Sequence, residues 1–534
     1  MWLPFRCSHH GAQHDRLPVS VRREWRYPVA CPVRLGGDRE MNGMETGSEI
    51  ASLAALLEFE NHPSLLEFVC PSTGVLLWPA IRNQVIRLMM SDWVYTTQPL
   101  VQVHGRLGLA RSAGVAVRAV VHNLTRPARP ARVLMYATGA GLIEREGSYF
   151  NRYTGYFSEA LRGDTWSVEG IPFDTWPMPR IDNRVSFSTP AKTWAFLRAK
   201  LALGSSEIRQ ATELVTLAER RAQQVLGWRL GNARRSWLIR FCARQLASYP
   251  LRRRNLEVWL RRVRPRLLLT EEGCYGHMAV LNATAREYGI PVAEFQHGIT
   301  TSGHIAYNVA PVLATNAKYR DTQPNYFLAY GSWWNAQFNA PVSKVVVGNP
   351  HRSALLERRE RPRVEAAPLV LVLGDGIETD LYIALCRELG ELLPAPFKVV
   401  FRPHPLERDR VLAGRCTKFG RVAIDQGRDI YPSLFKSHVV VSEVSTGLFE
   451  AAGLVERIFV WNTPKSRFSL PGHPFAHFGT ATELANAIQT TSAGFIRDSM
   501  QKSLWAPNWR ARFTRFTDSV INGNQDTETR LYCE

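Results

Sequence analysis

Cysteine is scarce in this chain of 534 residues, and its eight copies form no CxxC pair and no metal-binding spacing. Scattered cysteines argue against a disulfide framework and a structural zinc site, and they indicate a reducing compartment. Long apolar runs are also missing: no stretch of about 18 apolar residues occurs, so the sequence predicts no transmembrane helix. The first part of the chain lacks the apolar core of a secretory signal. We therefore expect a cytoplasmic protein.

Lysine is also rare in this chain. Only nine of the 66 basic residues are lysines, which leaves 57 arginines, and the formal net charge is +19. A charge of this size is typical of proteins that bind nucleic acid. A ratio of arginine to lysine this high also follows from GC-rich coding, without selection for phosphate binding. We therefore expect no nucleic-acid partner.

Composition and periodicity divide the chain into five parts. Residues 1–40 contain seven arginines and no periodic pattern, which predicts a disordered extension or a mis-assigned start. The other expected parts are a helical cap at 41–130, an N-terminal Rossmann-like acceptor domain at 131–350, a C-terminal Rossmann-like nucleotide-binding domain at 351–500, and a C-terminal helix and tail at 501–534.

Short apolar segments alternate with helical periodicity through most of the chain. In the clearest example, the strand-like segments Arg266–Thr270 and Val292–Phe295 flank a helical segment that stops at Gly289. The segment from Tyr149 to Leu161 has helical spacing as well. Alternation of this kind predicts an α/β fold with two doubly wound parallel sheets in tandem.

A basic helical insertion at about 205–265 interrupts the first of these domains. From Arg209 to Arg266 there are fifteen arginines and three glutamates. Its large aromatic residues are Trp228, Trp237, Phe241 and Trp259. Three interpretations remain open: a solvated helical face with aromatic side chains in the core, a helix pair lying on an anionic membrane surface, or a nucleic-acid surface.

The motif Arg402-Pro403-His404-Pro405 follows a short apolar strand. Each proline fixes its own φ and extends the preceding residue, so the imidazole is held in one direction. Further along, Val439–Val441 forms another strand, and Ser445 and Thr446 come where a helix begins. Hydroxyls and free N–H groups at a helix start form an anion site, and ligands of such sheets lie at the carboxyl ends of strands. We expect a nucleotide phosphate at this edge.

Polar side chains also follow strands of the first predicted sheet. Glu271 and Glu272 come directly after one strand, where a general base is expected, and Gln296-His297-Gly298 follows the next. Asp375, in a glycine-rich turn, is a further cleft candidate. Each has a structural alternative, because exposed loop acids are common and a strand-ending turn can require its glycine.

Taken in order, these motifs resemble the two-domain GT-B glycosyltransferases of bacterial surface polysaccharide synthesis. The nearest groups are capsule Kdo transferases, polysialyltransferases and CDP-glycerol glycerophosphotransferases. The resemblance covers roughly residues 266 to 461. It implies a nucleotide-activated donor, CMP- or CDP-linked, and a glycan or glycolipid acceptor. The nucleotide-binding residues that it implies are Arg402, His404, Ser442, Ser445, Thr446, Gly447 and Glu450, with Glu450 on the ribose hydroxyls.

The mechanism we expect is attack of an acceptor hydroxyl on the activated sugar. Glu271, Glu272 or His297 takes the proton, while His404 and the helix start at Ser445 stabilise the departing phosphate. No DxD-like pair occurs near the motifs, so we expect no metal, and no cofactor beyond the nucleotide sugar. The basic insertion suggests peripheral binding to the inner face of the membrane. The competing functions are a nucleotide-sugar epimerase and a non-enzymatic membrane or nucleic-acid adaptor.

Overall fold

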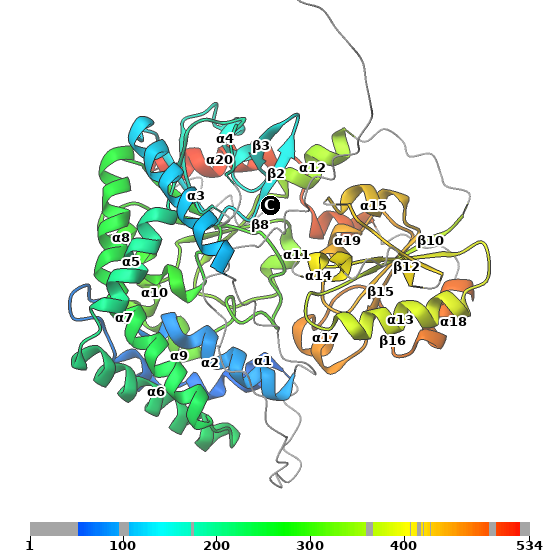
Figure 1. Cartoon of the computed structure of the whole chain (residues 1–534), viewed down its shortest axis with the longest axis horizontal. Helices are drawn as coiled ribbons and strands as arrows, with labels where there is room; N and C mark the ends of the chain where they lie inside the picture. The colour runs from blue at the N-terminus through cyan, green and yellow to red at the C-terminus, as the bar shows by residue number, and fades with distance from the viewer. Residues whose placement is uncertain are drawn as a thin grey trace, which may run out of the picture.

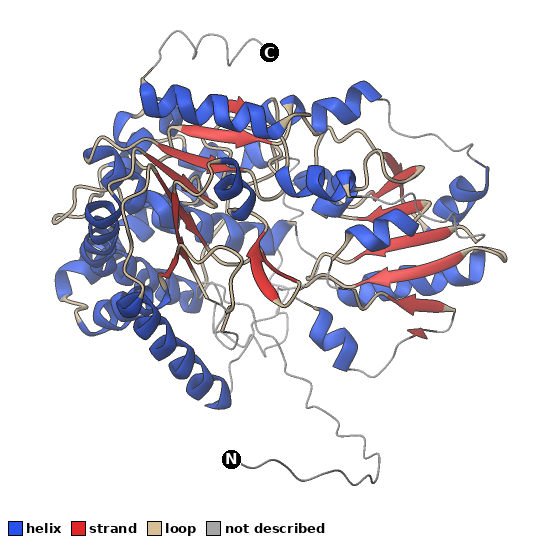
Figure 2. Cartoon of the chain, turned by 90° about the horizontal axis from the view of Figure 1, so that it is seen from above, coloured by secondary structure: helices blue, strands red, loops and turns tan. Residues whose placement is uncertain are grey.

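The computed structural model describes residues 52–94, 106–171, 176–358, 367–405, 407–413, 418–419, 421–427, 429–490 and 498–523. The extension expected at residues 1–40 lies outside this part of the chain. Within it, two domains lie side by side, each built around one sheet flanked by helices (Figures 1 and 2).

The first sheet contains seven strands among the described residues, and all of its neighbouring strands pair in parallel. In spatial order they are Val185–Phe187 (β5), Thr165–Glu169 (β4), Val133–Ala137 (β1), Leu267–Thr270 (β6), Val292–Phe295 (β7), Tyr326–Ala329 (β8) and Ser343–Val346 (β9). The winding direction reverses between β1 and β6, which creates a switch point at their carboxyl ends. The four residues of β6 are all buried, as expected for a strand covered on both faces.

The second sheet also has seven strands in the described part of the chain. In spatial order they are Lys418–Phe419 (β12), Val422–Ile424 (β13), Lys398–Arg402 (β11), Leu369–Leu373 (β10), Val439–Ser442 (β14), Arg457–Trp461 (β15) and Ala476–Phe478 (β16). Only the β12–β13 pairing at its edge is antiparallel. Its switch point lies between β10 and β14.

Helices cover both faces of each sheet (Figure 2). Those before the second sheet are Leu53–Leu57 (α1), Trp78–Trp93 (α2), Arg106–Thr125 (α3), Gly155–Ala160 (α4), Thr189–Leu201 (α5), Ser205–Leu226 (α6), Asn232–Val263 (α7), Ala279–Glu287 (α8), Pro311–Thr315 (α9), Ala317–Asp321 (α10), Ser332–Asn335 (α11) and Pro350–Glu357 (α12), with 3-10 turns at Glu58–Glu60 (η1), Pro63–Leu66 (η2) and Gly276–Met278 (η3). Those within and after it are Thr379–Leu392 (α13), Arg408–Ala413 (α14), Tyr431–Lys436 (α15), Thr446–Glu450 (α16), Pro464–Ser469 (α17), Ala481–Thr490 (α18), Asp498–Leu504 (α19) and Trp509–Asn522 (α20).

The last helix returns to the first domain. In Figure 1 α20 lies beside α4, and its Trp509, Phe513 and Phe516 are buried against the first sheet. A second apolar cluster joins the domains directly, because Trp334 of α11 contacts both Phe449 of α16 and Trp505. The expected fold class is confirmed: α/β, with two Rossmann-like doubly wound domains in a GT-B-like arrangement, a helical N-terminal region and a basic helical insertion.

The helix expected from Tyr149 to Leu161 is wrong in its first part. Leu142–Arg145 (β2) and Ser148–Asn151 (β3) form a two-stranded antiparallel hairpin, and the helix begins only at Gly155. The turn residues Glu146 and Gly147 have φ values of 49° and 73°. Two successive left-handed residues between short strands close a hairpin, and this local geometry outweighs the helical spacing.

The basic insertion forms the two long helices α6 and α7. Trp228 and Trp259 are buried, and Trp237 and Phe241 pack partly buried against the core that these helices share with α1 and α2. The structure therefore favours the first interpretation, a solvated basic face with its aromatic side chains in the core. No helix in the described part of the chain is long and apolar enough to span a bilayer.

Candidate active site in the cleft

The switch point of the first sheet holds a carboxylate in a fixed position. The Thr138 N–H and Oγ1 both donate to Glu271 Oε2, at 2.7 and 2.8 Å. Thr138 follows β1 and Glu271 follows β6, so the contact spans the point where the winding reverses. Burial, and after it the negative charge of Glu272, raises the pKa of Glu271 above its ordinary value.

Glu272 behaves in the opposite way. Burial alone would raise its pKa, but His277, 3.1 Å away, and the nearby His297 lower it below the ordinary value. Two adjacent carboxyl groups are thus driven toward different protonation states. Such separation is how active sites obtain an acid and a base from the same residue type.

His297 lies at the carboxyl end of β7. Its Nδ1 is 4.0 Å from Glu294 Oε1 and has no hydrogen-bond partner among the described residues. Burial lowers the pKa of His297, which keeps the imidazole neutral and able to accept a proton. Its neighbour Gln296 instead holds the loop together, because its side chain accepts from Tyr330 N–H at 2.8 Å and donates to the Gly298 carbonyl at 2.9 Å.

A pocket between the domains brings some of the predicted residues together. We call it the cleft pocket. It is lined by Arg152, Tyr153, Phe157, Phe295, Gln296, His297, Leu328, Tyr330, Val347, Gly348, Asn349, Pro350, His351, Thr446 and Glu450. The first sheet supplies strand ends and the segment after β3, the start of α12 follows the last of these strands, and α16 comes from the second domain. Ligands of open α/β sheets bind in this position.

The α16 side of the pocket carries the carboxyl group of Glu450 and the hydroxyl of Thr446. Burial raises the pKa of Glu450 even though Arg152 and Arg352 oppose the shift. Its carboxylate has no hydrogen bond to any other described residue. Arg152 donates to the Tyr153 hydroxyl at 3.0 Å, and its Nε is without a hydrogen-bond partner among the described residues. The pocket therefore contains both acceptor and donor groups that a polar ligand can use.

The start of α16 divides the predicted serine motif in two. Ser445 is the N-cap and accepts from Gly447 N–H at 3.1 Å, next to Thr446 in the pocket. Ser442 is fully buried and donates to the Leu373 carbonyl at 2.8 Å, which is a structural contact. A Cβ on Gly447 would come within 2.5 Å of Leu373 Cδ1, so this glycine is needed for packing.

The Arg402-Pro-His404 segment lies outside the cleft pocket. Arg402 forms an ion pair with Asp425, and the His404 N–H donates to Glu407 Oε1 at 2.7 Å. His404 follows β11 and Ser445 follows β14, and β10 lies between these two strands. The structure therefore places the two halves of the predicted phosphate site on opposite sides of β10.

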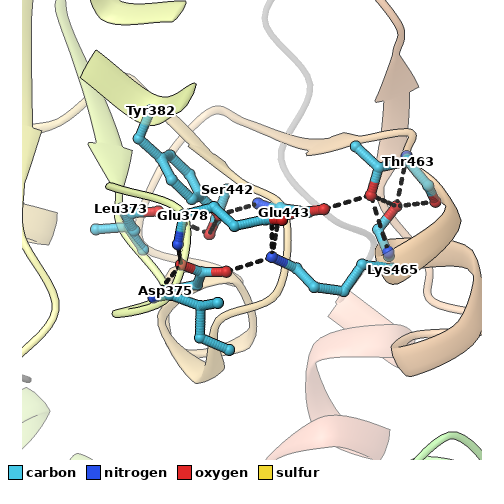
Figure 3. A network of polar contacts seen from close by, with 10 residues as sticks. Leu373, Asp375, Glu378, Tyr382, Ser442, Glu443, Thr463 and Lys465 are labelled. Carbon is cyan, nitrogen blue, oxygen red and sulfur yellow. Dashed lines mark hydrogen bonds and ion pairs between the residues drawn. The ribbon is translucent and has the colours of Figure 1, made fainter. Parts of the chain in front are cut away.

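Three carboxylates meet one ammonium at the switch point of the second sheet. Lys465 Nζ is 2.5 Å from carboxylate oxygens of Asp375, Glu378 and Glu443, and all four side chains are buried (Figure 3). Glu443 also accepts from the Thr463 hydroxyl. These residues, the lysine cluster, have the oxygen ligands of a cation site, with the carboxylate oxygens within 4.8 Å of one another. The ammonium takes the position of the cation.

Burial shapes the charges of the lysine cluster. It raises the pKa of Glu443 in spite of the neighbouring ammonium, and the three carboxylates raise the pKa of Lys465 against the effect of burial. The candidate Asp375 thus belongs to this cluster and does not line the cleft pocket.

Arg152, Tyr153 and Lys465 were not among the predicted site residues. Arg152 and Tyr153 follow a hairpin that was expected to be helical, which hid their position. Lys465 follows Thr463 and Pro464, a helix-start pattern, but nothing nearby in the sequence identifies its distant acidic partners.

Comparison with known proteins adds a likeness of fold. No protein-family profile and no curated protein sequence matches the chain. Among solved structures, a Methanocaldococcus jannaschii UDP-GlcNAc 2-epimerase in complex with UDP-GlcNAc and UDP aligns at 12% identity, over 72% of this chain and 98% of the epimerase, with a TM-score of 0.40. The calicheamicin glycosyltransferase CalG4 aligns at 10% identity, over 75% and 98%, with a TM-score of 0.38.

A variant of the wall teichoic acid polymerase TagF, soaked with CDPG, aligns at 11% identity over 80% of this chain and 98% of TagF, with a TM-score of 0.36. At these TM-scores we take neither a substrate nor a residue role from any of the three proteins. The fold class rests on the strand order of the two sheets themselves.

Proposed function

We propose that the protein is a glycosyltransferase that binds a nucleotide-activated sugar in the cleft pocket. The observation that carries the proposal is the pocket itself, which joins the strand ends around His297 to Thr446 and Glu450 of the other domain. A neutral imidazole faces an anion-binding helix start across this pocket. Transfer needs both groups: one accepts a proton from the attacking hydroxyl, and the other stabilises the leaving phosphate.

The donor nucleotide is assigned to the α16 side. The Thr446 hydroxyl, the Ser445 cap and the Arg152 guanidinium supply donors for phosphate oxygens, and Glu450 supplies acceptors for ribose hydroxyls. α16 has only five residues, so the hydroxyls and the arginine contribute more than the helix dipole does. The preference for cytidine nucleotides rests on the motif resemblance alone.

The acceptor is assigned to the first domain, with a glycan or glycolipid as its chemical class. His297 is the proposed proton acceptor, because burial keeps it neutral near pH 7. Glu272, at the end of β6, raises the pKa of His297 against the effect of burial, and Glu271 remains an alternative proton acceptor. His404 remains a proposed phosphate ligand that a rearrangement of the second domain would have to bring to the pocket.

Binding requires the domains to move. The cleft pocket encloses about 30 Å³, which is the volume of roughly one water molecule. A nucleotide sugar therefore enters only when α16 separates from the first domain, and closure around it then excludes water. The Trp334–Phe449 contact next to the pocket is the apolar interface that has to open.

A thermal-shift screen of free nucleotides tests the donor side. A ligand that binds only the native state stabilises it by about 2.7 kcal/mol at a hundredfold excess over Kd. We expect CMP or CDP to raise the melting temperature, uridine nucleotides to act more weakly, and cytidine without phosphate to have almost no effect. Thr446→Val should shrink the shift, while Thr490→Val, an exposed threonine on α18, should leave it unchanged.

The outcomes separate the alternatives. A shift with UDP alone would change the nucleotide class and keep the pocket. A protein that converts its nucleotide sugar without any acceptor is an epimerase. No shift with any nucleotide, from protein shown to be folded, would favour the non-enzymatic adaptor.

A further inference from the structure

Two helices of the first domain expose apolar side chains in regular rows. On α3 these are Val117, Val120, Val121 and Leu124, with exposed fractions of 63%, 43%, 52% and 76%. On α5 they are Trp194, Leu197 and Leu201, with 59%, 47% and 84%. Val120 and Val121 are each three or four residues from Val117 and Leu124, and Trp194, Leu197 and Leu201 have the same spacing, so each row forms one face of its helix.

The two rows form one continuous surface, which we call the apolar face. α3 and α5 are in contact on the outside of the first domain (Figure 1). A shallow apolar groove of about 310 Å³ runs between them, with Val120 on one side and Trp194 on the other. A surface this apolar on a globular domain marks an interaction site.

The apolar face is held rigidly from behind. Ala119, on the opposite side of α3, is fully buried beside Val185 and Phe187 of β5. His122 bonds to the Val185 carbonyl at 2.9 Å, and Asn123 exchanges two hydrogen bonds with the backbone of Phe187. The apolar rows are therefore presented outward by helices whose other sides are packed.

The charged side chains on the two helices of the apolar face are all basic. Neither α3 nor α5 contains an aspartate or a glutamate. Arg118, Arg198 and Lys200 are exposed on the two helices, and Arg126 and Arg129 follow α3. The Arg198 guanidinium lies 5.7 Å from the Trp194 ring centre. An exposed tryptophan among aliphatic side chains with a basic rim is the composition of a membrane-interface helix.

We propose that the apolar face binds the protein to the surface of an anionic lipid bilayer. Val120, Trp194 and Leu201 enter the boundary between headgroups and acyl chains, and the surrounding cations contact lipid phosphates. The inference is independent of the proposed function. It also moves the expected membrane contact away from α6 and α7, which have the arginines but keep their tryptophans in the core.

The basic side chains on α3 and α5 favour an anionic bilayer over a second copy of the chain or residues 1–40 as the partner of the apolar face. A second copy of the chain would bring Arg118, Arg198 and Lys200 against the same cations, with no acid on either helix to pair with them. Residues 1–40, with seven arginines, are themselves basic. An anionic lipid surface satisfies both the apolar rows and the cations.

Flotation of the full chain with vesicles tests the proposal. We expect binding to vesicles of phosphatidylcholine and phosphatidylglycerol, weaker binding in high salt, and little binding to phosphatidylcholine alone. The variant Trp194→Ser with Leu197→Ser should bind roughly tenfold or more weakly, because two large apolar side chains no longer enter the bilayer. Arg198→Gln should cost roughly fivefold.

The matched control removes two positive charges outside the apolar face. Arg209→Gln with Arg220→Gln, on the exposed side of α6, should change vesicle binding less than the loss of Arg198 does. If the Trp194/Leu197 variant does not fold, Leu201→Ser, at the most exposed position of α5, replaces it.

Three results would overturn the proposal. One is no binding of the full chain to anionic vesicles at low salt. Another is equal binding by the native chain and the folded Trp194/Leu197 variant. The third is self-association in light scattering that this variant abolishes, without vesicle binding by the native chain, which would make the face a contact between copies.

Discussion

At the switch point of the first sheet, Glu271 is held by Thr138, and Glu272 lies beside the imidazole of His277. At the switch point of the second sheet, the corresponding acids Asp375 and Glu443 lie against Lys465. The strand order around both points is the same. The two switch points therefore differ in the group that pairs with their carboxylates, a histidine in the first sheet and a lysine in the second.

A histidine can exchange a proton in the physiological pH range, whereas the three carboxylates raise the pKa of Lys465 and hold it in its charged form. The pKa values of Glu271 and Glu272 are shifted in opposite directions, and the pocket begins at the neighbouring strand with His297. The lysine cluster has three carboxylates for one ammonium, burial raises the pKa of Glu443, and the cluster does not line the cleft pocket. We infer that the first switch point serves the pocket, because His297 follows the neighbouring strand, and that the ion pairs of the second switch point hold its sheet together.

The largest expected effect follows from removing the ammonium. Lys465→Met leaves three buried carboxylates without their cation, which should lower the free energy of unfolding by about 3–5 kcal/mol. Denaturant titration measures it. The matched control is Lys502→Met: this lysine pairs with Asp498, and both are exposed, so we expect a change below about 1 kcal/mol. Equal, small losses in both variants would show that the lysine cluster contributes little to stability.

The first domain should show the opposite behaviour, with activity lost and stability kept. His297→Ala removes the proposed proton acceptor and should lower the rate of transfer by about 10²- to 10⁴-fold. His297 Nδ1 has no hydrogen-bond partner among the described residues, so the loss of stability should be smaller than that of Lys465→Met. Initial rates with the donor found in the nucleotide screen measure the effect. The nucleotide-induced thermal shift should survive, and a normal rate would assign the proton to another group.

Sequence patterns predicted the parts of the fold that depend on local interactions. Leu369–Leu373 and the first three residues of Val439–Ser442 are continuous apolar runs, and Ser445 is the helix cap that its residue type suggests. The β2–β3 hairpin was missed because two turn residues outweigh the periodicity around them.

The site was harder to predict because it depends on distant residues. His404 and Ser445 each follow a parallel strand of the second sheet, so the sequence predicted that they lie close together. In the structure, β10 lies between those two strands. Lys465 meets Asp375 across 90 positions of sequence, and no local pattern encodes such a contact. What could be predicted was the edge of each sheet at which polar groups gather, and not which of them share a pocket.

The stability of the first domain should also depend on pH, through Glu294, whose Oε1 lies 4.0 Å from His297 Nδ1. Burial raises the pKa of Glu294 from 4.5 to about 8, against hydrogen bonds from Cys274 N–H and the Tyr307 hydroxyl. A raised pKa means that the folded state holds the proton, so this stability is complete below about pH 4.5 and is lost as the pH rises through about 8.

Glu294→Gln copies the protonated form. The variant should match the native chain near the acid end of this window and become relatively more stable toward pH 8, by at most about 1.4 kcal/mol per pH unit for one proton. Denaturant titrations across the window measure the difference between the two chains, which cancels other titrating groups. A constant difference would place the pKa of Glu294 near its ordinary value.

The smallest expected effect concerns Gly298, which is best compared with Gly139, another glycine that follows a strand of the first sheet. Gly139 has a φ of 85°, and a Cβ there would lie 2.2 Å from the Gly170 carbonyl oxygen, so Gly139→Ala should destabilise the fold clearly. Gly298 has no φ in the left-handed region, and a Cβ there would meet nothing within 4 Å. Gly298→Ala should therefore change the free energy of unfolding by less than about 1 kcal/mol. If melting is unchanged but transfer is lost, a ligand approaches this backbone closely, and the motif glycine serves binding. If both survive, the glycine of Gln296-His297-Gly298 is dispensable, and the motif reduces to the imidazole and the amide that positions its loop.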